Sequence, residues 1–125
     1  MRAYSLSHPS DPVLLRELTT LVVRDRAVTA ALLAHLAEVD ARRLYLPAAY
    51  PSMFAYCVRE LRFSDEAAFK RIHAARTARR FPAIFEAIAD GRLHLSAVIL
   101  LAPRLTPETA DELLAAAAHR SKAEI

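Results

Sequence analysis

The 125-residue chain contains only one glycine and one cysteine. It has no tryptophan, and aromatic residues make up 7% of it. One glycine excludes a glycine-rich phosphate-binding loop, and one cysteine excludes an internal disulfide bond and fits a reducing cytoplasm. No run approaches the ~18 consecutive apolar residues of a membrane-spanning helix. The first ten residues lack the apolar core of a signal peptide. We therefore expect no membrane segment.

The residues that are abundant favour helices. Hydrophobic residues make up 54% of the chain, with alanine and leucine dominant, and both are strong helix formers. The formal net charge of +3 is mild and by itself a weak indication of an anionic partner. The composition predicts an all-α fold, in which a long N-terminal amphipathic helix packs on a small multi-helix bundle containing a helix-turn-helix-like unit.

The predicted organisation has three parts: a flexible tail over residues 1–9, a long helix over 10–46 and a helical bundle over 47–125. Ser10 and Pro12 form a helix start, and no breaker follows until about Tyr45. The pattern fits one long helix or two with a bend near Arg24, and its apolar stripe is a possible homodimer surface. Apolar residues recur at alternating four- and three-residue spacing, if Asp25 and His35 are counted as polar members, at Leu14, Leu18, Leu21, Val28, Leu32 and Val39.

The most informative stretch, residues 63–82, starts like a helix and then becomes almost entirely basic. Ser64 can cap the helix, and Asp65 and Glu66 lie in the first turn, where the helix dipole favours negative charge. Another predicted helix, roughly residues 53–61, ends just before it. A helix, a very short turn and a basic helix are the outline of a helix-turn-helix DNA reader over residues 52–80. The candidate DNA-binding residues are Phe69, Lys70, Arg71, His73, Arg76, Arg79 and Arg80.

The expected partner is therefore double-stranded DNA. The four arginines of this set are expected to hold phosphates, while Phe69, Lys70 and His73 are candidates for the groove. The turn position that often holds glycine holds Arg62 here, which departs from the pattern.

The alternative is a helical bundle with a solvated basic face that serves as a protein-interaction or dimerisation domain. One structural observation separates the two hypotheses. Either the last three arginines of the set form one exposed patch, or they are paired with nearby acids, for which Glu60, Glu86 and Asp90 are the candidates.

Nothing in the chain indicates catalysis, a metal site or a cofactor. The five histidines are scattered, and no pair has the four-residue spacing, with a glutamate between, of a helical zinc site. Cys57 lies on the apolar side of its helix, where a free cysteine behaves as a small hydrophobe. His94 is expected at a helix start or on the surface.

An ordered series of motifs gives the chain a family resemblance. These motifs are RRLYL at 42–46, YPSMFAYCVRELRFS at 50–64, AAFKRIHAARTARRFP at 67–82, GRLHLSAVILLAPRLTPE at 91–108 and the final SKAEI. Over about residues 34–125 the chain resembles the N-terminal helical region of bacterial HNH endonuclease family proteins. The middle segment is also similar, over a shorter length, to helix-turn-helix regions of plasmid-partition-type DNA binders.

The resemblance implies a DNA-targeting domain that is non-catalytic by itself. In those proteins a separate C-terminal nuclease module follows, with metal-binding histidines and an asparagine, and no matching motif occurs here. Ser121 and Glu124 form a capping-box pattern at the end of the sequence. A helix start at that position predicts that this chain is the front part of a longer protein.

Overall fold

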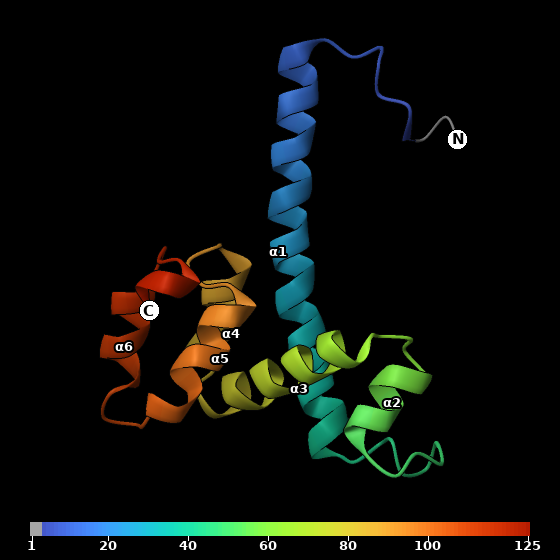
Figure 1. The fold of residues 1–125 in the computed structure, drawn as a ribbon, viewed down its shortest axis with the longest axis vertical. Helices are drawn as coiled ribbons and strands as arrows, with labels where there is room; N and C mark the ends of the chain where they lie inside the picture. The colour runs from blue at the N-terminus through green and yellow to red at the C-terminus, as the bar shows by residue number, and fades with distance from the viewer. Residues whose placement is uncertain (1–3) are drawn as a thin grey trace.

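The computed structural model describes residues 4–125; residues 1–3 of the predicted tail lie outside the described range. The described chain is all-helical, and a long N-terminal helix packs on a small helical bundle, which confirms the predicted fold class (Figure 1). No helix in this range is long and apolar enough to cross a membrane. The helices are α1 (Asp11–Ala41), α2 (Met53–Arg59), α3 (Asp65–Arg80), α4 (Ala83–Ala89), α5 (Leu95–Leu101) and α6 (Ala110–Ala117), with short 3-10 turns at Ala102–Arg104 and Lys122–Glu124.

The first helix is one continuous element of 31 residues, about 46 Å long at 1.5 Å per residue. It has no break near Arg24, so the one-helix alternative is correct. Its buried residues all lie in the C-terminal part, which packs against α3 and α4. Figure 1 shows the N-terminal half of α1 extending beyond the other helices. The buried residues of α1 are Ala30, Leu33, Leu36 and Ala37.

The third helix is the centre of the bundle, because it packs against α1, α2 and α5. Its buried residues form two faces, and all of them except Ile72 are alanine or threonine. Small side chains let the neighbouring helices approach closely on both sides. The hydroxyl of Thr77 donates to the His73 carbonyl over 2.9 Å, so this buried polar group is satisfied. One face comprises Ala68, Ile72 and Ala75, and the other Ala74, Thr77 and Ala78.

The turn between α2 and α3 is short, and a serine cap begins the helix on each side of it. Both helices begin at serine caps, since Ser52 accepts from the Ala55 N–H over 3.0 Å and Ser64 from the Ala67 N–H over 3.1 Å. Arg62 has a φ of 63°, in the left-handed region that glycine favours. The chain therefore makes this turn with a residue that is strained there.

The turn after α4 also depends on one residue and positions α5. Gly91 has a φ of 83°, a left-handed conformation that favours glycine. A Cβ there would lie 2.7 Å from Nη1 of Arg26, so the end of this flexible side chain would also have to shift. His94 then caps α5, accepting from the Ala97 N–H at Nδ1 over 3.2 Å, as the sequence predicted for a helix start.

Substitution of Arg62 tests the strain in the α2–α3 turn. An L-residue in the left-handed conformation costs about 1–2 kcal/mol of folding free energy, which glycine avoids. Glycine also makes the unfolded chain more flexible, and this offsets about 0.5–1 kcal/mol of the gain. We expect Arg62→Gly to raise the free energy of unfolding by about 0.5–1 kcal/mol, and the β-branched Arg62→Val to lower it by more than about 1 kcal/mol. Urea denaturation followed by circular dichroism measures both. A glycine variant less stable than Arg62→Val would contradict the assignment.

Candidate nucleic-acid interface

The crossing of α1 and α3 brings the basic end of α3 against two carboxylates near the end of α1. Arg76 donates to Asp40 through Nε over 2.7 Å and through Nη2 over 3.1 Å, a bidentate pair. This hydrogen bond to Asp40 raises the pKa of Arg76 above its ordinary value. The pair joins residues 36 positions apart and links the two helices where they cross.

Glu38 is the second carboxylate, and it lies between two arginines. Its Oε2 accepts from Arg42 over 2.8 Å, and its Oε1 accepts from Arg79 over 3.2 Å. The hydrogen bonds from Arg42 and then Arg79 lower the pKa of Glu38 below its ordinary value of 4.5. All three side chains are about half exposed, so the pairs are screened by water.

Arg80 differs from its neighbours, because none of the ion pairs among residues 4–125 includes it. Its guanidinium lies 5.1 Å from the centre of the Phe81 ring. Arg80, Arg76 and His73 also line a shallow pocket of about 260 Å³, whose lining contains no acidic residue. The pocket is completed by Thr77, Ala102 and Pro103.

We call the basic end the group formed by Arg42, Arg76, Arg79 and Arg80. These four arginines face two carboxylates, so the group keeps an excess of two positive charges. An exposed surface with an excess of arginines and an acid-free hollow is suited to phosphate groups.

Phe69 and Lys70, two of the other predicted site residues, belong to the N-terminal part of α3. Phe69 is 61% exposed, and its ring centre is 5.9 Å from that of His73. The Lys70 Nζ lies 3.3 Å from Glu66, so its charge is balanced within α3. The N-terminal half of the helix therefore has little positive charge to offer, in contrast to its C-terminal half.

Arg71 does not share a surface with the basic end. It lines a different pocket, of about 450 Å³, between α1, α3 and the turn before α5, together with Arg26 and Asp25. Its guanidinium lies 5.3 Å from the Phe63 ring centre, and its Nε is buried without a hydrogen-bond partner in the described chain. The structure thus separates this arginine from the three that follow it.

The acids that pair with the basic end are not those expected from the sequence. Glu60 accepts from the Tyr50 hydroxyl over 2.7 Å, and Asp90 is bound by Arg92 over 2.9 Å. Glu86 forms no ion pair within the described residues. Arg76 and Arg79 are nonetheless paired, with carboxylates of α1, while Arg80 is not. No local pattern reveals these pairs, because they depend on where two distant helices cross.

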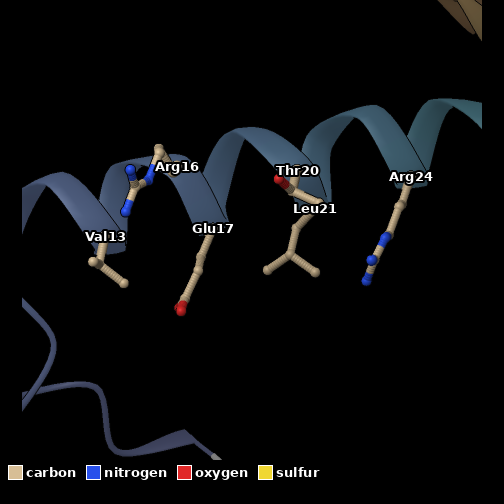
Figure 2. Close-up of a pocket in the computed structure, with 6 residues that line it drawn as sticks. All are labelled: Val13, Arg16, Glu17, Thr20, Leu21 and Arg24. Carbon is tan, nitrogen blue, oxygen red and sulfur yellow. The ribbon is translucent and has the colours of Figure 1, made fainter.

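Three other features of residues 4–125 bear on a reactive site: the one cysteine, the potential metal ligands and a hollow beside α1. Cys57 is completely buried, and burial raises the pKa of its thiol above the ordinary value, which disfavours the nucleophilic thiolate. Among residues 4–125, no three His, Cys, Asp or Glu side chains gather as metal ligands. A hollow beside the N-terminal half of α1 is lined by residues of that helix alone, so it is an open surface (Figure 2).

Comparison with known proteins identifies no relative: no family model, no curated protein and no solved structure matches the chain.

The pKa of Glu38 gives a direct test of the paired geometry. Since it is lower in the folded state than in the unfolded state, the two ion pairs stabilise the fold above about pH 4.5, and this contribution is lost as the pH falls through the folded pKa. Arg42→Ala should raise the pKa of Glu38 toward its ordinary value, whereas Arg43→Ala, at the adjacent arginine, should leave it unchanged. A carboxyl carbon NMR titration measures both. Equal pKa values in the two variants would contradict the pairing.

Proposed function

We propose that the chain is a DNA-docking domain, non-catalytic by itself, in which the basic end of α3 contacts the phosphates of double-stranded DNA. The observation that carries the proposal is the excess of two positive charges on an exposed surface beside an acid-free hollow. Arginine is the side chain best suited to phosphate because its guanidinium donates two parallel hydrogen bonds. Arg80 is the leading candidate for a phosphate contact, because it takes part in none of the ion pairs of the described residues and need not break one to bind.

The contact is assigned to the C-terminal half of α3. Asp65 and Glu66 in the first turn are exposed, and they repel phosphates. Arg79 can exchange Glu38 for phosphate at small cost, since exposed ion pairs contribute about 0–1 kcal/mol. The pair of Arg76 with Asp40 is costlier to break, because the Asp40 side chain is only 17% exposed. Phe69 and His73 lie along the exposed side of the same helix and remain candidates for the groove.

The resemblance to the front region of HNH endonuclease family proteins gives this activity a context. A nuclease module needs a separate surface to hold the duplex, and a backbone-contacting domain supplies affinity without dictating sequence. In this proposal the domain brings a nuclease-type protein to DNA and takes no part in cleavage.

Arginine substitution tests the DNA contact. We expect Arg80→Ala to lower the slope of log affinity against log salt concentration by about one, and the double variant Arg76→Ala, Arg80→Ala by about two. The measurement is fluorescence anisotropy with random-sequence duplex DNA across a salt series. Arg16→Ala, at the far end of α1, removes the same charge and serves as the control. Binding that is identical in all four proteins, with helicity intact, would exclude the basic end as the DNA surface.

Removing a negative charge beside the arginines should strengthen DNA binding, whereas damage to the fold would weaken it. Glu38→Gln frees Arg42 and Arg79 from their shared carboxylate, so it should strengthen duplex binding at low salt, by several-fold, and this gain should fade at high salt as screening increases. Glu112→Gln, at an exposed acid of α6 that takes part in none of the ion pairs of the described residues, is the matched control. Unchanged or weaker binding by Glu38→Gln would count against the proposal.

One observation favours a second candidate function, a protein-association domain without nucleic-acid binding. Large apolar side chains are exposed along the N-terminal half of α1, away from the basic end. Soluble chains rarely expose contiguous apolar surface unless a partner covers it. Absence of duplex binding even at low salt would leave this candidate as the preferred one.

A further inference from the structure

The N-terminal half of α1, residues 11–28, carries large apolar side chains, most of which are exposed. Figure 1 shows this half of the helix extending beyond the other helices. Leu18 and Leu21 at its middle are 57% and 58% exposed. Their neighbours at helical spacing are also apolar, which makes a continuous stripe along one side. We define the α1 stripe as Leu14, Leu15, Leu18, Leu21, Val22 and Val28.

The stripe runs in line with the face of α1 that the bundle buries. Leu15, Val22, Thr29 and Leu36 follow one another at seven-residue spacing, so they lie on the same side of the helix. Leu36 is buried, whereas Leu15 and Val22 are exposed. A second helix laid parallel on the stripe would run into α3 and α4, which pack on α1 beyond residue 28. An antiparallel helix meets no such obstacle.

We propose that the stripe binds the same stripe of a second copy of this chain, in antiparallel orientation. The register that places Leu18 opposite Leu21 of the second copy also places Asp11 opposite Val28, because both pairs of residue numbers sum to 39. The uncovered segment, residues 11–28, is therefore matched along its whole length by its own reversed copy. This inference is independent of the DNA-docking proposal.

The charges beside the stripe fit the same register. Glu17 and Arg24 project on the side of the helix where Leu21 also projects (Figure 2). Both residues border the α1 stripe on the same side. In an antiparallel pair this side of one helix lies next to the same side of the other, so Glu17 of each copy lies beside Arg24 of the other. Two opposite-charge pairs thus border the seam symmetrically.

A parallel pair would instead bring two equal charges together. Asp25 lies in the seam, and parallel pairing sets it directly against Asp25 of the second copy, where like charges repel. In the antiparallel register Asp25 faces Leu14, and the two aspartates are about 16 Å apart along the axis, at 1.5 Å per residue. Electrostatics and the position of the bundle therefore select the same orientation.

The length of the matched segment limits how strongly two copies of the chain associate. Residues 11–28 span about 27 Å of helix. A single helix pair of this length lies near the lower limit of about 1,200 Å² for stable interfaces, so we expect a monomer–dimer equilibrium at micromolar concentrations.

Sedimentation equilibrium tests the surface. Leu18→Lys should raise the dissociation constant at least about tenfold, because it places a charge in the apolar seam. Val23→Lys is the matched control, since Val23 is 54% exposed but lies off the stripe. Glu17→Arg and Arg24→Glu should each weaken the dimer, and the double variant should restore it. A wild-type chain that stays monomeric at every concentration would overturn the proposal and assign the stripe to another partner.

Cysteine cross-linking in a Cys57→Ala background tests the orientation. A mixture of Leu14→Cys and Asp25→Cys chains should cross-link between the two variants, while Leu14→Cys alone should not, because its two copies are about 16 Å apart in the antiparallel register. Cross-linking of Leu14→Cys to itself would show a parallel pair and overturn the orientation while leaving self-association intact.

Discussion

The packing of α3 on the C-terminal part of α1 is the contact on which the rest of the structure depends. α3 also contacts α2 and α5, and α4 packs on α1, so the crossing holds the bundle together. Alanines on both buried faces of α3 make the close approach possible, and the ion pair of Arg76 with Asp40 links the two helices beside it. The same crossing produces the candidate site, because it brings the arginines of α3 beside the carboxylates of α1.

The helices themselves were predictable because residues close together in the sequence determine where each helix starts and which side of it is apolar. Ser64 caps α3 as expected, and α3 spans Asp65–Arg80. Ser52 caps α2 in the same way. By their four- and three-residue spacing, one side of α3 comprises Ala68, Ile72, Ala75 and Arg79. The first three are buried, but Arg79 is exposed and paired with Glu38. A long charged side chain can lie at the edge of a buried face, and its spacing does not reveal this.

The ion-pair partners were not predictable. Asp40 and Glu38 lie some 40 positions before the arginines they bind, and their proximity follows from an interhelical angle that no sequence pattern encodes. The sequence also does not show which part of α1 is buried, because its apolar residues continue past the point where the bundle ends. Leu33 and Leu36 are core residues, while Leu18 and Leu21 are exposed, although all four share the same helical periodicity.

The composition of the exposed half of α1 makes its lack of a neighbour physically significant. Residues 11–28 include six β-branched residues among eighteen, and such side chains lose rotamer freedom in a helix and favour it less than alanine or leucine. Isolated helices of about this length are marginal in water even with better formers. The folded C-terminal half supplies the nucleus from which the helix extends, but residues 11–28 gain little burial in the monomer, where only Val13 and Leu14 are half-buried. A partner on the stripe would supply that burial, so association and the helicity of this segment are thermodynamically coupled.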